Sequence, residues 1–125
     1  MDEMLKIFKA MSDKNRLLVL AALCKCDQLC ACQIIELLGV TGATASRHME
    51  VLINSKLVKS EKKGRWVHYH LNEEGGCPIL LLNWLKSKFQ DDSTIQELLE
   101  RLEEITACEP QDLTRRQRAM REAGT

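Results

Sequence analysis

The sequence contains no hydrophobic run long enough to cross a membrane and no segment typical of a signal peptide. No apolar stretch approaches the roughly 18 residues that a membrane helix needs. The first residues, MDEMLKIFKAM, include acidic side chains where a signal peptide would carry positive charge. We therefore expect a cytoplasmic protein without a membrane partner.

Sequence motifs of catalysis are absent as well. There is no H-E-x-x-H zinc motif, no phosphate-binding loop and no G-x-S-x-G nucleophile turn. The apolar segment 78–88 carries no set of His, Asp and Glu at helical spacing, which argues against a zinc site with hard ligands there. We expect no catalytic residues and predict that the protein is not an enzyme.

The chain also lacks net charge, but its charges are unevenly distributed. Lys and Arg number 18, and Asp and Glu number 18. Positions 41–71 hold six basic and two acidic residues, a net charge of +4, whereas positions 72–112 hold three basic and ten acidic residues, a net charge of −7. A local basic stretch in a neutral chain is typical of a protein that binds phosphates with one face, although a solvated charged surface would give the same counts.

Cysteine, by contrast, is abundant. Four of the six cysteines fall within nine residues: Cys24, Cys26, Cys30 and Cys32. In a cytoplasmic protein such a cluster favours metal binding or redox sensing over structural disulfides. The alternative is that these side chains are small hydrophobic residues of a core. Cys77 and Cys108 lie far from the cluster, and the sequence leaves their roles open.

The hydrophobic pattern predicts a single, mainly α-helical domain with a small β-hairpin. Two short helices, 30–38 and 44–54, are joined by Gly39-Val40-Thr41, which is a helix-turn-helix pattern. The β-prone runs 57–61 and 66–71 follow directly and predict a wing. We expect a winged helix-turn-helix domain over 1–108 and a disordered basic tail over 109–125.

The C-terminal half contains more apolar helix than so small a domain can cover. The segment from Pro78 is apolar around most of a helix, and the segment from Ser93 carries a line of Ile and Leu side chains. We expect a homodimer formed through the C-terminal helices with help from the first helix.

Polar side chains at the start of the fourth helix are the candidates for reading DNA. They are Thr44, Ser46, Arg47 and His48. The first residues of a recognition helix reach the major groove of double-stranded DNA. In the expected wing, Arg65 is a candidate for a contact to the DNA backbone or the minor groove, and Lys62 and Lys63 are candidates for phosphate contacts. Each of these residues taken singly could equally be a plain surface residue.

An ordered set of motifs resembles the ArsR/SmtB family of metal-responsive repressors, and within it the arsenical-resistance repressors. The motifs are Phe8-Lys9-Ala10-Met11-Ser12-Asp13 with Arg16, Leu29-Cys30-Ala31-Cys32, Ser46-Arg47-His48, and Gly64-Arg65-Trp66-Val67-His68-Tyr69. They occur in the family's order, and the similarity covers about positions 4 to 108.

The resemblance implies a homodimer that blocks a resistance operon and leaves its operator when As(III) or Sb(III) engages thiolates at the third helix. Cys30 and Cys32 match the family's Cys-x-Cys ligands. The chain departs from the pattern where an Asp usually follows the second cysteine, here Gln33, and where a third cysteine usually stands, here Ile35. Two upstream cysteines are then the candidates for a third thiolate: Cys26, which lies nearer, and Cys24.

Other functions fit the same residues. Soft thiolates also suit a sensor of Cd(II), Pb(II) or Zn(II), and a dithiol could sense oxidants or persulfides. A thiol oxidoreductase is the remaining alternative, but the chain lacks the βαβ pattern in which a redox Cys motif usually stands.

Overall fold

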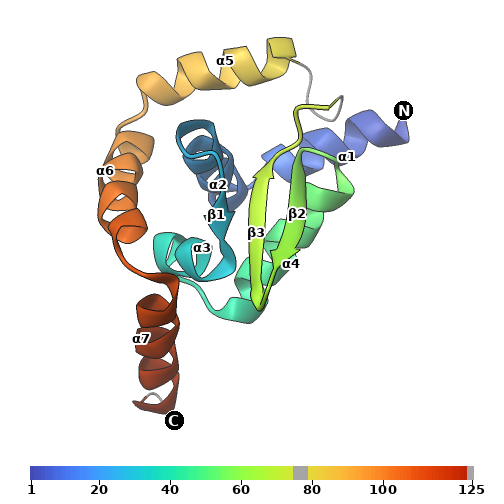
Figure 1. Ribbon diagram of the computed structural model, residues 1–125. Helices are drawn as coiled ribbons and strands as arrows, with labels where there is room; N and C mark the ends of the chain where they lie inside the picture. The colour runs from blue at the N-terminus through green and yellow to red at the C-terminus, as the bar shows by residue number, and fades with distance from the viewer. Residues whose placement is uncertain (75–78, 124–125) are drawn as a thin grey trace.

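The computed structural model describes residues 1–74 and 79–123, which form seven helices and three strands (Figure 1). In chain order the elements are α1 (Asp2–Met11), α2 (Lys14–Lys25), β1 (Leu29–Cys30), α3 (Ala31–Leu38), α4 (Gly42–Asn54), β2 (Val58–Lys63), β3 (Trp66–Leu71), α5 (Ile79–Gln90), α6 (Ser93–Ala107) and α7 (Pro110–Ala123). Within these residues, no helix has both the length and the apolar content needed to cross a bilayer.

Local signals in the sequence set boundaries of the helices α2, α3 and α4. The carboxylate of Asp13 caps α2 by accepting a hydrogen bond from the backbone N–H of Arg16 at 3.1 Å. Gly39 ends α3 in the left-handed conformation, with φ at 64°. The hydroxyl of Thr41 then caps α4 by accepting from the backbone N–H of Thr44. The predicted helix-turn-helix is therefore confirmed.

The predicted hairpin is also present, but it belongs to a sheet of three antiparallel strands in the order β1-β3-β2. Lys63 pairs with Trp66 across a two-residue turn, and Gly64 takes the positive φ of 62° that such a tight turn requires. β1 was not predicted, because two residues are too short to show any periodicity. It places Cys30 opposite His68 of β3 and so joins the wing to the start of α3.

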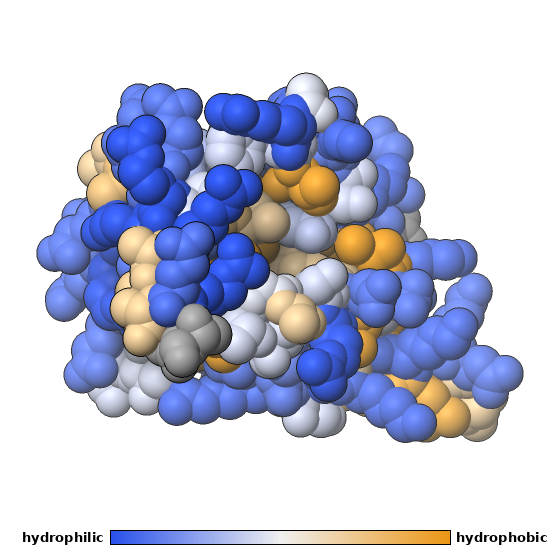
Figure 2. All heavy atoms as spheres, turned by 90° about the horizontal axis from the view of Figure 1, so that it is seen from below, coloured by the Kyte–Doolittle hydropathy of each residue, from blue (hydrophilic) through white to orange (hydrophobic). Residues whose placement is uncertain are grey.

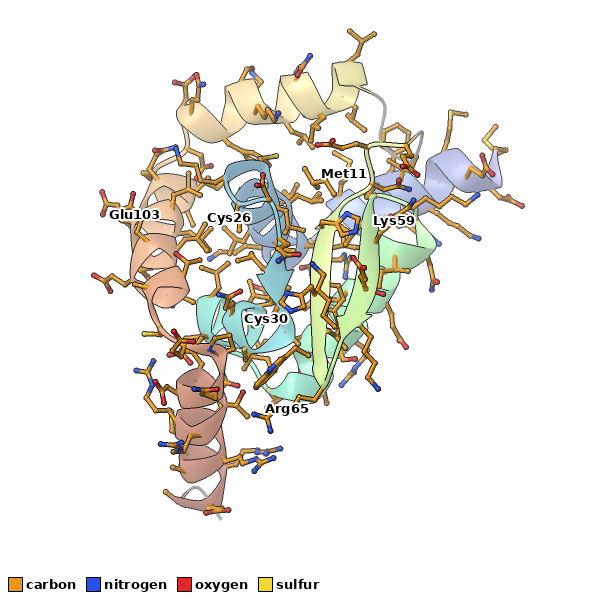
Figure 3. All side chains as sticks on the ribbon, in the orientation of Figure 1. Met11, Cys26, Cys30, Lys59, Arg65 and Glu103 are labelled. Atoms are coloured by element: carbon orange, nitrogen blue, oxygen red, sulfur yellow. The ribbon has the colours of Figure 1, made fainter. Side chains whose placement is uncertain are left out.

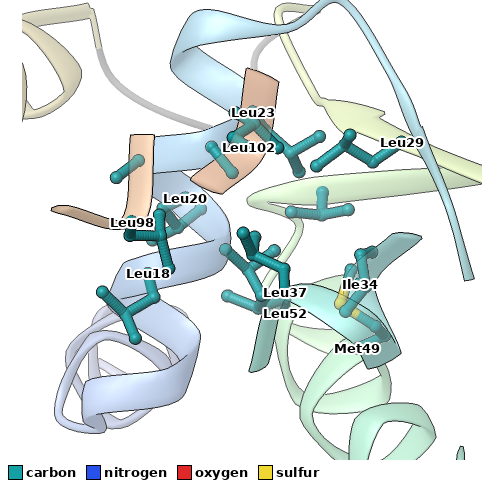
Figure 4. Packing of buried hydrophobic residues seen from close by; sticks show 14 of the residues in the cluster. Leu18, Leu20, Leu23, Leu29, Ile34, Leu37, Met49, Leu52, Leu98 and Leu102 are labelled. Atoms are coloured by element: carbon teal, nitrogen blue, oxygen red, sulfur yellow. The ribbon is translucent and has the colours of Figure 1, made fainter. Parts of the chain in front are cut away.

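A single core lies between α2, α3, α4 and α6 (Figure 4). Leu20, Leu52 and Leu102 are each 2% exposed or less. The apolar side of α6 faces this core, because its Ile and Leu side chains pack on α2 and α3 of the same chain. This differs from the expectation that the helix from Ser93 is left over for a dimer contact.

The chain after Cys108 differs from the expected disordered tail. Residues 110–123 form α7, which projects from the lower side of the molecule in Figure 1 and packs against α3. Leu113 is 0% exposed, and the side-chain amide of Gln117 donates to the carbonyl oxygen of Cys32 at 2.9 Å. Composition suggested disorder because the segment is polar, whereas one buried leucine and one long-range hydrogen bond anchor it.

The architecture is therefore a mainly helical winged helix-turn-helix with a three-stranded antiparallel sheet, as the sequence predicts for the fold class.

Candidate functional site

Cys30 and Cys32 lie together at the start of α3, and both are buried thiols, 1% and 5% exposed. Cys30 is the N-cap residue, with extended backbone. Its backbone N–H donates to the side-chain oxygen of Gln33 at 2.8 Å, and its sulfur accepts from the backbone N–H of Gln33. The extended cap residue lets two cysteines spaced two apart meet, which a continuous helix would not allow.

The two thiols have opposite electrostatic environments. A hydrogen bond from the Cys32 thiol, helped by backbone N–H groups of the first turn, lowers the pKa of Cys30 to about 6 against the effect of burial. The same hydrogen bond, together with burial, raises the pKa of Cys32. The environment of the pair therefore favours one shared negative charge, with the thiolate favoured at Cys30, and a thiolate is the form that binds soft ions.

The helix α7 covers this pair. Thr114 lowers the pKa of the Cys32 thiol against the larger effects of Cys30 and burial, and its hydroxyl donates to the carbonyl oxygen of Pro110 at 2.9 Å. Gln117 donates to the Cys32 carbonyl and, at 3.3 Å, to the carboxylate of Glu36. Thr114 and Gln117 were not among the predicted site residues. The spacing of Leu113, Gln117 and Met120 is compatible with a helix, but nothing in the sequence shows that this segment meets α3.

The other predicted ligands are not gathered with the pair. Cys26 follows the end of α2 and lies away from Cys30 (Figure 3), and burial and the nearby Asp27 raise the pKa of its thiol. Cys24 lines a separate cavity of about 460 Å³ with Lys59 and His70. In the described parts of the chain, no three His, Cys, Asp or Glu side chains are grouped to hold a metal ion.

The two remaining cysteines were left without a role. Cys77 lies outside the described residues. The sulfur of Cys108 donates to the carbonyl oxygen of Glu104 and accepts from Arg116, both at 3.6 Å. Its contacts are with α6 and α7.

At the start of α4, some of the predicted DNA-contacting residues are exposed and others are partly buried. Ser46 and Arg47 are exposed. Thr44 is half-buried, and its hydroxyl accepts a hydrogen bond from the hydroxyl of Thr41 at 3.0 Å, as part of the helix cap.

His48 points into the molecule instead of toward solvent, with its side chain 15% exposed. A guanidinium nitrogen of Arg16 donates to Nδ1 of His48 at 3.2 Å, and Asn15 contacts Nε2 at 3.5 Å. Arg16 also donates to the carbonyl oxygen of Ala10 at the end of α1. In this conformation His48 therefore joins α4 to α2, where the sequence analysis expects it to face DNA.

The wing carries its three predicted basic residues on exposed positions. Arg65 lies at the tip (Figure 3), and its guanidinium stacks over the ring of Trp66 at 5.1 Å. The ammonium of Lys63 donates to the side chain of Gln28 at 3.0 Å, and Lys62 is exposed on the same strand. The basic wing and the exposed Arg47 of α4 come from two elements in contact, α4 and β2, and can meet two parts of one DNA duplex.

Comparison with known proteins identifies the family. Residues 13–60 match the family model described as "Bacterial regulatory protein, arsR family". The cadmium resistance transcriptional regulatory protein CadC of Listeria innocua is 39% identical over 85 residues, which cover 68% of this chain and 69% of that protein. The chain belongs to the ArsR family. Members of this family are regulatory proteins, so the predictions of the family and of a protein that is not an enzyme are both confirmed.

Two further similarities bear on this ArsR-family chain. The arsenical resistance operon repressor of Bacillus subtilis is 37% identical over 67 residues, which cover 54% of this chain. The match spans 64% of that repressor, less than two thirds of its length. A homodimeric winged helix-turn-helix DNA-binding domain from Mycobacterium bovis has the same fold, with a TM-score of 0.61 and 21% identity over 74% of this chain and 82% of that domain.

Proposed function

We propose that this chain is a transcriptional repressor that binds operator DNA as a homodimer and leaves it when As(III) or Sb(III) binds Cys30 and Cys32. One observation carries the proposal: two buried, hydrogen-bonded thiols lie at the first turn of the helix that packs against the recognition helix α4. An ion that takes both sulfurs acts directly on the helix-turn-helix.

DNA binding is supported by the exposed basic residues of α4 and the wing. Arg47 suits a base or phosphate contact in the major groove, and Lys62 and Arg65 suit phosphates beside it. Two recognition helices reach successive major grooves only when two chains associate. The homodimeric Mycobacterium bovis domain of the same fold agrees with this assembly.

The release mechanism follows from the hydrogen bonds that the sulfurs already make. An ion bound to Cys30 and Cys32 would replace the hydrogen bond between them and the one from the backbone N–H of Gln33, which caps α3. Because both sulfurs are buried, the first turn of α3 has to open before they can be reached. Inducer binding therefore favours a conformation with a displaced α3, and a coupling of about 3 kcal/mol would lower DNA affinity by roughly a hundredfold.

Cadmium is the second candidate inducer, because a relative named for cadmium resistance is 39% identical over 85 residues. Thiolates bind both kinds of soft ion. A divalent ion of the zinc type requires four donors in a structural site. The described residues group no three donors, which favours an ion that two or three sulfurs satisfy.

The test measures release of the reduced protein from the DNA upstream of its own coding region. Fluorescence anisotropy of the DNA reports the release while arsenite, antimonite or Cd(II) is titrated in. We expect arsenite or antimonite to release the wild-type protein. Cys30→Ser and Cys32→Ser should bind DNA as the wild type does and lose release, because each removes a sulfur ligand. Cys108→Ser, which removes a thiol outside the pair, is the matched control and should keep release.

Different results would change the proposal in different ways. Loss of DNA binding in both Ser variants would show that the thiols are structural and would contradict an inducer site. Release by Cd(II) alone would identify Cd(II), the second candidate, as the inducer. Release by peroxide that a reductant reverses would identify a redox sensor.

A further inference from the structure

The helix α7 forms one wall of a groove on the same side of the molecule as the wing tip. The groove has a volume of about 660 Å³ and lies between α3, the turn joining α3 to α4, the wing and α7. Seen from below, this face is mostly hydrophilic around a hollow in which more apolar atoms are visible (Figure 2). The groove therefore adjoins the surface that we assign to DNA.

Arginine side chains from two elements line this groove. Arg65 reaches it from the wing, and Arg118 and Arg121 reach it from α7; all three are exposed. Among the described lining residues the one acid is Glu36, whose carboxylate accepts a hydrogen bond from Gln117. Three positive charges and one negative charge leave the groove with a net charge of +2.

The arginines occupy one side of an anchored helix. Arg121 follows Gln117 by four residues and Arg118 by three, the spacings of neighbours on a helix surface, and all three line the groove. Leu113 and the hydrogen bond from Gln117 to the Cys32 carbonyl hold α7 against α3. The guanidinium groups are therefore presented from a fixed element, which lowers the conformational entropy lost on binding a partner.

We propose that α7 is an additional DNA-binding element, in which Arg118 and Arg121 bind backbone phosphates next to those bound by Arg65 of the wing. The inference rests on the proposed function, because it extends the same DNA-binding surface. Duplex DNA is the partner favoured by the charge of the groove and by its continuity with the wing. Phosphate contacts of this kind raise affinity without reading sequence.

The test measures DNA affinity as a function of salt concentration, on a mixed-sequence duplex and on the DNA upstream of the coding region. The logarithm of the DNA association constant falls linearly with the logarithm of the salt concentration, and each lost phosphate contact makes this slope shallower by about 0.9. Arg118→Gln/Arg121→Gln removes two contacts in each protomer and four in the dimer. We therefore expect the salt dependence to become shallower by about 3.6 on both duplexes. Arg118→Lys/Arg121→Lys keeps the charges and should keep most of the slope.

The matched control is Arg115→Gln/Arg116→Gln, which removes the same charge from the same helix at positions outside the groove. It should leave the slope close to that of the wild type. Circular dichroism of each variant checks that α7 remains helical, and the single variants Arg118→Gln and Arg121→Gln repeat the measurement if the double variant loses helix.

Three outcomes would overturn the inference. An unchanged slope in Arg118→Gln/Arg121→Gln, together with a reduced slope in Arg65→Gln, would remove α7 from the DNA surface and leave the proposed function intact. Tighter DNA binding by the double variant would mean that α7 obstructs DNA. A wild-type protein that binds neither duplex would overturn both the inference and the proposed function.

Discussion

Among single residues, Cys30 and Cys32 are alike in the sequence and unlike in the structure. Their spacing was enough to predict that they act together. It could not predict which one ionises, because that depends on the hydrogen bond between the sulfurs and on the N–H of Gln33. The same limit applies to His48. It lies about 100° round the helix from Arg47, and only the packing of α4 on α2 shows that it turns inward.

Replacing Cys32 tests what lowers the pKa of Cys30. Cys32→Ala removes the largest cause of the low pKa of Cys30, a hydrogen bond that stabilises its charged form, while burial still favours the neutral form. We expect the pKa of Cys30 to rise from about 6 toward or beyond its usual value of 9.0, as measured by ultraviolet absorbance of the thiolate against pH. Cys108→Ala serves as the control and should leave the titration near pH 6 in place. A titration unchanged in Cys32→Ala would contradict the hydrogen bond.

The lowered pKa also predicts how stability depends on pH. A group whose pKa falls on folding stabilises the native state fully above its unfolded value, and the contribution is lost as the pH falls through its folded value. For Cys30 the window runs from about 6 to 9.0, so the free energy of unfolding should rise with pH across it. The difference between the wild type and Cys30→Ser in urea unfolding at several pH values isolates this contribution, and a parallel pH dependence in both proteins would contradict it.

Individual elements differ in how well the sequence predicts them. The helix-turn-helix and the hairpin carry strong local signals in Asp13, Gly39, Thr41 and Gly64, so their existence and order follow from the sequence. α7 begins at Pro110, a residue favoured at the first position of a helix, but its docking on α3 has no comparable signal. Its attachment depends on a hydrogen bond between residues 85 positions apart, and no local pattern can encode such a contact.

Leu113 is the residue through which the docking of α7 can be tested. An isolated helix of 14 residues is marginal in water, so α7 needs its contact with α3 to stay folded. Leu113→Ala should weaken that contact by about 2–5 kcal/mol and cause α7 to unfold. The expected result is a loss of helical circular dichroism and of amide protection confined to 110–123. Met120→Ala, at a position 74% exposed, is the control and should change neither.

For the molecule as a whole, the distribution of apolar surface indicates where the second chain of the proposed homodimer would bind. The apolar side of α6 was expected to form a dimer contact, but it packs in the core of its own chain. α1 and α5, at the upper side of the view in Figure 1, keep large apolar side chains exposed instead. Phe8 is 59% and Trp84 is 55% exposed, and exposed apolar groups of this size mark interaction surfaces.

We therefore expect Phe8→Glu to weaken the dimer, because it would bury an unpaired charge in the interface. Sedimentation velocity should show a shift toward monomer at concentrations where the wild type is dimeric, and operator affinity should fall with it. Met120→Glu adds the same charge to an exposed apolar position on α7 and should stay dimeric. Because Met120 lines the groove that we assign to DNA, this variant is the control for the sedimentation result alone. A dimeric Phe8→Glu protein would place the interface elsewhere.

If Cys30 binds an inducer as proposed, the shortness of β1 has a consequence for how fast the protein can respond. A strand of two residues at the edge of a sheet is among the first parts of a protein to open, whereas Cys30 within it is 1% exposed while the edge stays closed. An ion can reach the sulfur only during an opening. At low ion concentration the rate at which Cys30 binds an ion rises with that concentration. At high ion concentration an ion binds during every opening, so the rate levels off at the rate of opening. The delay before induction then has a minimum length, set by the motion of the protein and independent of the dose.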